Sequence, residues 1–328
     1  MKSFEYAAPK DLKEATGLLS EQWGETEILA GGTDLISCLK QEIVSPKRVV
    51  SLKKISNLRG IKSDRNTLRI GAMTTLSELI ASKDVQKHFP ALLTAARNIA
   101  SPQMINMGTV GGDLCQRPRC WYFRNGHGLL GAAKSDKGTS LVRDGENRYH
   151  AIFGTDGPAL FVSASSFGPA LVALGATLTA EGPGGKTRQI EAADFFRAPK
   201  SETEREIALK SNEVLTEIAI PLKGLKNATY EIRHRFGLDW PYVTATVAYA
   251  AQNGFVSDAR IVLGHVAATP WNATAAARAL NGAKLDEATT AKCGEAAVDG
   301  AKPLSQNGYK LQLVKTAVKR ALLGAQTA

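Results

Sequence analysis

Two short glycine-rich segments carry the residue types in this chain that are best suited to holding an anion. The first is Ala30-Gly31-Gly32-Thr33-Asp34 and the second is Gly108-Thr109-Val110-Gly111-Gly112-Asp113. Because glycine has no Cβ, backbone there can turn tightly and approach a ligand, and consecutive N–H groups can converge on a phosphate. Thr109 and Asp113 add a hydroxyl and a carboxylate suited to sugar or phosphate hydroxyls. Each segment alone is also explained by an ordinary turn, and neither has the spacing of a Rossmann or P-loop motif.

The surroundings of the first segment strengthen the interpretation. Residues 27–30 read as the end of a short buried strand, Gly31-Gly32 interrupts it, and Thr33-Asp34 can cap a helix over residues 35–42. A strand, a glycine pair and a capped helix together place a helix N-terminus against a phosphate. Two such segments in one chain suggest a dinucleotide held from two sides.

Six collinear stretches connect these segments to a known family. They are LAGGTDL (29–35), LRIGAMTTLSEL (68–79), SPQMINMGTVGGDL (101–114), PALVALGATL (169–178), EVLTEIAIP (213–221) and ARIVLGHVAATPW (259–271). With them the chain resembles, over essentially its whole length, the FAD-binding subunit of the xanthine dehydrogenase family of molybdenum hydroxylases. CQRPRCWYFR (115–124) and ENRYHAIFG (146–154) are similar to flavin subunits of bacterial aldehyde oxidoreductases whose subunits are separately encoded.

The resemblance implies an α+β fold. It consists of a two-lobed FAD-binding domain of the vanillyl-alcohol-oxidase/PCMH-like type, followed by an α+β C-terminal domain with a three-stranded antiparallel sheet and helices. We divide the chain into an N-terminal α/β lobe (1–57), a second FAD-binding lobe (58–211) with an insertion at 117–150, and a C-terminal domain (212–328). The three strands expected in the last region cover 214–220, 242–250 and 255–263, with an Asn253-Gly254 hairpin turn between the second and third. Helices are expected at 272–280 and 308–323.

The resemblance also assigns residues to FAD. Residues 30–35 should contact the pyrophosphate through their backbone, and residues 108–113 should close on it from the other side. Ile99 and Leu215 stand where the family packs aliphatic side chains on the isoalloxazine, although an ordinary core position explains both equally well. Ser166 stands where the family usually has an aspartate, and a serine can still hydrogen-bond a ribityl hydroxyl. The full set of candidate cofactor-binding residues is Leu29, Ala30, Gly31, Gly32, Thr33, Asp34, Leu35, Ile99, Ser101, Gly108, Thr109, Gly111, Gly112, Asp113, Ser166 and Leu215.

The implied function is that of an FAD-binding electron-transfer subunit of a molybdenum-containing hydroxylase or dehydrogenase. Its implied partners are a [2Fe-2S] iron–sulfur subunit and a molybdopterin-binding subunit, and we assign no catalytic residue to this chain. One alternative is a stand-alone FAD oxidase of the vanillyl-alcohol-oxidase type. Another is a scaffold that has lost its flavin.

The cysteines predict a chain without its own metal centre. Relatives in the subgroup place a [4Fe-4S] cluster on four cysteines of the insertion, and Cys120 matches the first of these ligands. Residues 124–150 contain no cysteine, and Ala159 stands where a later ligand would fall. Cys115 adds at most a second sulfur, whereas Cys38 and Cys293 belong to other parts of the chain. We therefore predict no cluster and no metal ligands.

Composition limits the classes of protein to which the chain can belong. The chain has 328 residues, of which 44% are hydrophobic, enough for two or three domains with a large core. There is no apolar run of membrane-spanning length and no export signal, and four scattered cysteines suit a reducing compartment. We therefore expect a cytoplasmic protein, with export together with a partner subunit as the alternative. The formal net charge is +10, but the basic residues are dispersed, which argues against nucleic-acid binding.

Overall fold

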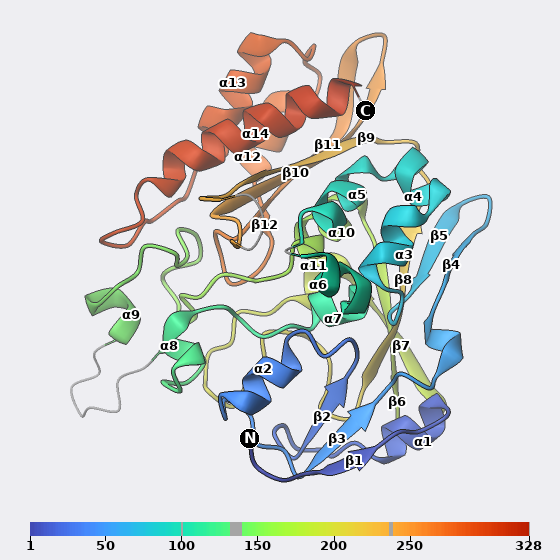
Figure 1. Ribbon diagram of the computed structural model, residues 1–328. Helices are drawn as coiled ribbons and strands as arrows, with labels where there is room; N and C mark the ends of the chain where they lie inside the picture. The colour runs from blue at the N-terminus through green and yellow to red at the C-terminus, as the bar shows by residue number, and fades with distance from the viewer. Residues whose placement is uncertain (100, 132–139, 236–238, 328) are drawn as a thin grey trace.

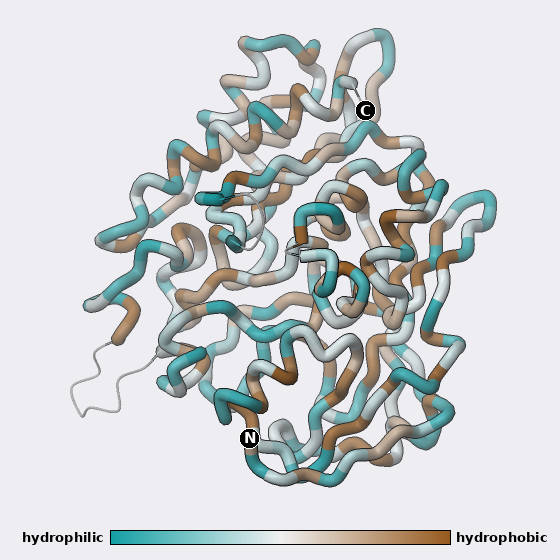
Figure 2. Tube along the Cα trace, viewed as in Figure 1, coloured by the Kyte–Doolittle hydropathy of each residue, from teal (hydrophilic) through white to brown (hydrophobic). Residues whose placement is uncertain are grey.

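The computed structural model describes residues 1–99, 101–131, 140–235 and 239–327 (Figure 1). Three sheets organise it: a small parallel sheet near the N-terminus, a five-stranded sheet in the middle of the chain, and a four-stranded sheet near the C-terminus. Figure 2 shows hydrophobic residues along the strands and polar residues at the outer turns. No helix among the described residues combines the length and the apolar character that crossing a bilayer requires.

The N-terminal lobe alternates strands and helices as predicted. Its strands are parallel in the order β1-β3-β2. Asp11 caps the first helix by accepting a hydrogen bond from the Glu14 amide at 2.8 Å. The second helix ends at Lys40, earlier than the predicted residue 42, and Glu42 adopts a left-handed φ of 55°. The elements are β1 (Glu5–Ala7), α1 (Leu12–Gly17), β2 (Thr26–Leu29), α2 (Leu35–Lys40) and β3 (Arg48–Ser51).

The second lobe contains an antiparallel sheet in the order β4-β5-β8-β6-β7. Helices α3, α5 and α10 pack against its apolar residues in the largest core cluster of the described chain. Its elements are η1 (Ser56–Leu58), β4 (Ile61–Ser63), β5 (Thr67–Gly71), α3 (Leu76–Ala81), α4 (Lys83–His88), α5 (Pro90–Arg97), α6 (Pro102–Met107), α7 (Val110–Leu114), α10 (Phe167–Leu174), β6 (Thr177–Gly182), η2 (Pro183–Gly185), β7 (Lys186–Glu191), α11 (Ala192–Phe195) and β8 (Val214–Pro221).

Strand β8 corrects the predicted division at residues 211/212. We expected it in the C-terminal sheet, but it lies between β5 and β6 and pairs with both. Its alternating apolar residues identify a strand, yet periodicity alone does not say which sheet a strand joins. Pairing therefore places β8 with the second lobe.

The insertion (117–150) contributes two short helices, α8 (Trp121–Arg124) and α9 (Leu141–Asp144). Part of the insertion, 132–139, lies outside the described residues. Phe123 and Leu129 pack with Phe161 in a small core cluster of their own.

The C-terminal domain has four antiparallel strands in the order β12-β11-β10-β9, so the prediction of three strands is wrong. Two strands escaped prediction, because β9 carries polar and apolar residues without a clear pattern and β12 is only two residues long. The predicted hairpin turn is confirmed by the positive φ of Asn253 and Gly254. Helix α14 packs on β9 and β10, whereas α10 of the second lobe contacts β10 and β11. The elements are β9 (Lys226–Ile232), β10 (Val243–Gln252), β11 (Phe255–Gly264), β12 (Trp271–Asn272), α12 (Thr274–Leu280), α13 (Glu287–Ala296) and α14 (Lys310–Thr327).

Candidate cofactor site

Three adjoining cavities meet at Thr109, which lines all of them. The loop cavity runs along residues 26–38 and reaches Leu215. The central cavity contains Ile99, Asp113 and Ser166 and is bordered by the β9–β10 connection. The outer cavity passes Gly31 and Lys53-Lys54. A string of connected cavities of this kind suits an elongated dinucleotide.

Nearly all the predicted cofactor-binding residues line these cavities; Leu29 and Ser101 line none of the three. Ser101 instead caps α6, accepting a hydrogen bond from the Met104 amide. Ile99 and Leu215 line different cavities, the central one and the loop cavity. Their contact with the two faces of one ring therefore stays a prediction.

The first glycine segment presents free backbone donors. Among the described residues, no acceptor is found for the amides of five consecutive positions, Gly31, Gly32, Thr33, Asp34 and Leu35. Gly32 has a φ of 82°, a left-handed conformation that glycine adopts at low cost. Consecutive free amides at the start of a helix attract an anion, so this segment has the donors that a pyrophosphate requires.

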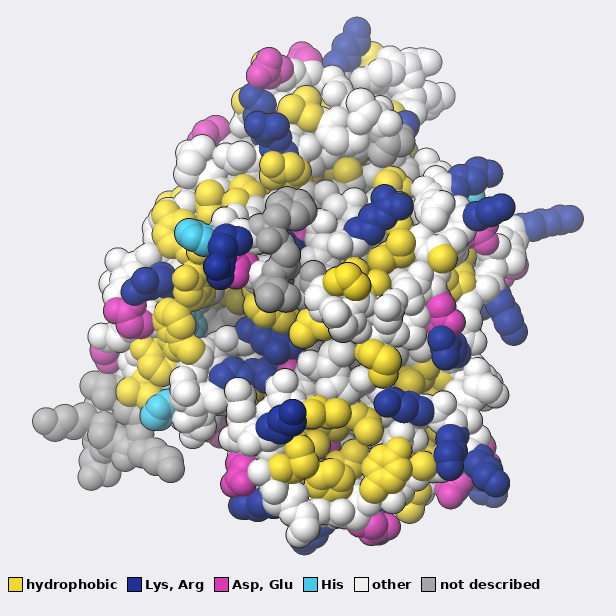
Figure 3. Space-filling view, in the orientation of Figure 1, with side chains coloured by type: hydrophobic (Ala, Val, Ile, Leu, Met, Phe, Trp, Pro, Cys, Tyr) yellow, Lys and Arg dark blue, Asp and Glu magenta, His cyan; other side chains and the backbone are white. Residues whose placement is uncertain are grey.

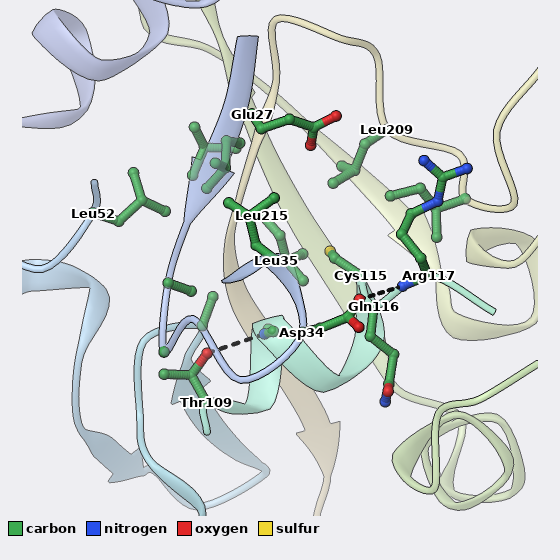
Figure 4. Close-up of a pocket in the computed structure, with 18 of the residues that line it drawn as sticks. Glu27, Asp34, Leu35, Leu52, Thr109, Cys115, Gln116, Arg117, Leu209 and Leu215 are labelled. Atoms are coloured by element: carbon green, nitrogen blue, oxygen red, sulfur yellow. Dashed lines mark hydrogen bonds between the residues drawn. The ribbon is translucent and has the colours of Figure 1, made fainter. Parts of the chain in front are cut away.

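The second segment differs from the prediction of a glycine turn with free amides. Val110 begins helix α7, and Thr109 caps it by accepting a hydrogen bond from the Gly112 amide at 3.1 Å (Figure 4). The Val110 and Gly111 amides donate to the carbonyls of Thr74 and Ala72, both at 2.9 Å. The amides of residues 110–112 are therefore already used inside the protein. This segment shapes the cavities, and Thr109 offers its hydroxyl.

Contacts within the protein require glycine at positions 31 and 111. A Cβ on Gly31 would overlap the carbonyl oxygen of Met107, and one on Gly111 would lie 2.8 Å from the Ala72 Cβ. A side chain at either position is therefore excluded by the protein itself, whether or not a ligand is bound. The absence of Cβ lets the two segments pack directly on their neighbours.

Asp34 has a different role from the predicted helix cap, because its side chain makes no capping bond to α2. Its Oδ1 accepts from Arg119 Nη2 at 3.0 Å and from Arg124 Nη2 at 2.9 Å. Its Oδ2 accepts from the backbone amide of Arg117 at 2.8 Å (Figure 4). One carboxylate thus ties the first glycine segment to the start of the insertion.

Asp113 is buried beneath the central cavity. It accepts hydrogen bonds from the Ser165 hydroxyl and the Gln116 amide, both at 2.8 Å. Burial nevertheless raises the pKa of this carboxyl to about 6, because the hydrogen bonds only partly offset the loss of water.

We expect Asp113→Asn to change how stability depends on pH. The pKa of Asp113 in the folded protein lies above its unfolded value of 3.8. The carboxyl therefore makes its full contribution to the free energy of unfolding below pH 3.8, and that contribution is lost as the pH rises through 6. The free energy of unfolding of the parent protein should fall by about 2 kcal/mol relative to Asp113→Asn between pH 4 and pH 7. Urea denaturation of both flavin-free proteins measures this, with the exposed Asp258→Asn as a control. If the difference in unfolding free energy between the two proteins stayed constant from pH 4 to pH 7, the pKa of Asp113 would not be raised in the folded protein.

Sequence reasoning missed a buried ion pair at the wall of the central cavity. Glu231 on β9 pairs with Arg233, and their side chains are only 1% and 7% exposed. Burial raises the pKa of Glu231, while Arg233, Asn98 and Ser166 lower it. Glu231 lies near the end of β9 and Arg233 directly follows that strand, which was not predicted from its sequence. Arg233 is thus buried at the cavity, whereas Arg235 is exposed and pairs with Asp239.

The cysteines are all free thiols. Cys120 Sγ lies 3.1 Å from His150 Nε2, and Cys38 Sγ accepts from Arg124 Nη1 at 2.9 Å. In the described part of the chain, no group of three or more His, Cys, Asp or Glu residues is arranged to hold a metal ion. The absence of an iron–sulfur cluster stays a prediction.

Comparison with known proteins identifies both halves of the chain. Residues 2–223 match the FAD binding domain in molybdopterin dehydrogenase, and residues 228–325 match the CO dehydrogenase flavoprotein C-terminal domain. The carbon monoxide dehydrogenase medium chain of Hydrogenophaga pseudoflava is 30% identical over 98% of this chain and 96% of its own length. The aldehyde oxidoreductase FAD-binding subunit PaoB of Escherichia coli is 29% identical over 99% of both chains.

Solved structures share this fold. The carbon monoxide dehydrogenase of H. pseudoflava matches with a TM-score of 0.77 and 30% identity, over 99% of this chain and 98% of the other. Quinoline 2-oxidoreductase from Pseudomonas putida 86 matches with the same TM-score and 27% identity, over 100% and 98%. The boundary between the two matched regions lies after β8, in agreement with the strand pairing. The free amides of residues 31–35, the connected cavities and these matches agree, and the chain belongs to the family of FAD-binding medium subunits of the molybdenum hydroxylases.

Proposed function

We propose that this chain is the flavin subunit of a multi-chain molybdenum hydroxylase, where it receives electrons from [2Fe-2S] clusters of one partner and passes them to an external acceptor. The observation that carries this proposal is the collinear match of both family domains, over residues 2–223 and 228–325. Relatives matched over nearly their full length are named as a medium chain and as an FAD-binding subunit, names that imply further chains.

The residues of this chain fit the cofactor in a definite way. The free amides of residues 31–35 would hold the pyrophosphate, and Thr109 would offer a hydroxyl next to it. Ile99 and Leu215 would provide apolar walls that exclude water. Bound FAD supplies the redox chemistry, whereas the protein binds and orients it.

We assign oxidation of the organic substrate to a molybdopterin-binding partner. The chain purified alone should then contain one FAD, and its visible absorption should not change when benzaldehyde or xanthine is added without oxygen. The assembled complex should lose flavin absorption when its substrate is added, and dithionite should bleach both preparations as a control. Co-purification with two further polypeptides is the second expected result.

The alternative of a stand-alone FAD oxidase makes the opposite prediction. Bleaching of the isolated chain by an organic substrate would support that alternative and overturn the assignment to a complex. A purified chain without flavin absorption would instead support the scaffold interpretation.

A further inference from the structure

A second kind of cavity lies between the insertion and the C-terminal domain. It has a volume of about 360 Å³, and we call it the aromatic cavity. Figure 3 shows hydrophobic side chains together with histidine and basic side chains on the left of the view, where these two parts of the chain lie. It shares Arg119 and Trp240 with the central cavity, where the Arg119 guanidinium lies 4.5 Å from the Trp240 ring centroid. None of the predicted cofactor-binding residues lines it.

Aromatic rings form the walls of this cavity and hold one another in place. Tyr149 stacks on Tyr242 with ring centroids 5.4 Å apart and an angle of 8° between the planes. Trp121 meets Tyr149 edge-on at 5.2 Å, and Phe161 adds a further apolar surface. Tyr149 and Trp240 remain 42% and 38% exposed, so part of this wall is open to solvent. Fixed rings of this kind favour a planar apolar group between them.

The wall contains a cation without a negative partner. Lys310 is 1% exposed, and its Nζ donates to the carbonyls of Tyr149, His150 and His265 at 3.1, 3.0 and 2.9 Å. Three neutral carbonyls orient the ammonium but do not neutralise it, and Lys310 has no ion pair within the described ranges. Burial lowers the pKa of Lys310 to about 7, so an anion in the adjacent cavity would favour the charged ammonium over the neutral amine. Burial and the charge of Lys310 lower the pKa of His150 to about 4 and that of His265 to about 3, so both imidazoles are neutral at pH 7.

Two arginines on the wall have a carboxylate partner. Arg119 pairs with Asp34, and Arg235 pairs with Asp239. Asp34 carries one negative charge but pairs with both Arg119 and Arg124, so positive charge exceeds negative charge on this described wall, and Lys310 adds to the excess. A buried charge of this kind is stabilised when an anion enters the adjacent space.

We propose that the aromatic cavity binds a planar aromatic molecule that carries a carboxylate or a similar oxyanion. The ring lies among Trp121, Tyr149 and Tyr242, and the anionic group points toward Lys310. This site adjoins the central cavity but is lined by none of the predicted cofactor-binding residues, and it does not depend on which partners the chain assembles with.

Calorimetric titration of the FAD-loaded chain tests the proposal, because bound FAD keeps the probes out of the flavin site. The probes are 2-naphthoate and the uncharged 2-naphthylmethanol. We expect one naphthoate per chain, bound about tenfold or more tightly than the alcohol, because only the carboxylate interacts with the Lys310 charge. Absence of binding, or equal affinity for the two probes, would overturn the proposal.

Two variants locate the site. Val162→Phe should fill the cavity and abolish binding of both probes, and Lys310→Met should remove the preference for naphthoate. Lys302→Met is the matched control, since Lys302 is exposed on the same domain and pairs with Asp156. Circular dichroism and flavin content show whether each variant folds. If Lys310→Met does not fold, the probe comparison and Val162→Phe still decide the question, and unchanged binding by Val162→Phe refutes it.

Discussion

Asp34→Ala should destabilise the protein and release most of its flavin. The carboxylate holds Arg119, Arg124 and the backbone of Arg117, and all three side chains of this ion-pair group are largely buried. Removing it leaves two guanidinium groups without their negative partner, which should cost about 3 kcal/mol of unfolding free energy. The first glycine segment also loses its connection to the insertion, so the free amides of residues 31–35 are no longer held in one arrangement. Urea denaturation and flavin absorption per chain measure the two effects.

Asp156→Ala is the matched control for this variant. Asp156 also pairs with a cation, Lys302, at 2.8 Å, but both side chains are mostly exposed. A solvated pair of this kind contributes less than about 1 kcal/mol, so this variant should keep its stability and its flavin. If Asp34→Ala were as harmless as Asp156→Ala, the carboxylate would not be what organises the arginines.

Gly31→Ala should have an effect of similar size, for a steric reason. The added Cβ would overlap the carbonyl oxygen of Met107 and lie 2.9 Å from its carbonyl carbon, so backbone must move on one side or the other. Overpacking against backbone should cost about 2–3 kcal/mol, and the displaced segment should bind FAD poorly. Thermal unfolding of the flavin-free and flavin-loaded protein measures both consequences.

The flavin-free measurement separates two explanations for Gly31. If a side chain at this position collided only with the cofactor, the flavin-free variant would be as stable as the parent protein. The contact with Met107 instead predicts that the flavin-free variant is already destabilised. Gly17→Ala provides the control, because a Cβ at Gly17 would meet no atom within 4 Å. That control should change stability by less than about 1 kcal/mol.

Features that depend on a few neighbouring residues were predicted well. The Asn253-Gly254 pair forms the predicted hairpin turn through its positive φ values. The alternation of strands and helices in the N-terminal lobe was also predicted correctly. In each case the interactions that decide the structure lie within a turn or two of the chain, so the local sequence contains them.

The family, and with it the cofactor, was also available from the sequence. The two glycine segments belong to a series of collinear stretches that resemble one family over the whole chain. The matches to both family domains confirm that resemblance. Most of the predicted cofactor-binding residues, including Thr109, Asp113 and Ser166, line the connected cavities. Their contact with FAD stays a prediction.

The family, the two glycine segments and the hairpin turn can be read from the order of the residues, whereas the contacts of those residues are set only when the chain folds. Asp34 stands at the start of a helix, but it accepts hydrogen bonds from Arg117, which lies 83 positions later in the chain, and from Arg124, which lies 90 positions later. The amides of Val110 and Gly111 look free in the sequence, yet they donate to Thr74 and Ala72 of a neighbouring segment. Strand β8 joins the five-stranded sheet, and Lys310 reaches three carbonyls far from it in sequence. These outcomes depend on which surfaces meet when the chain folds, and residue type and periodicity do not contain that information.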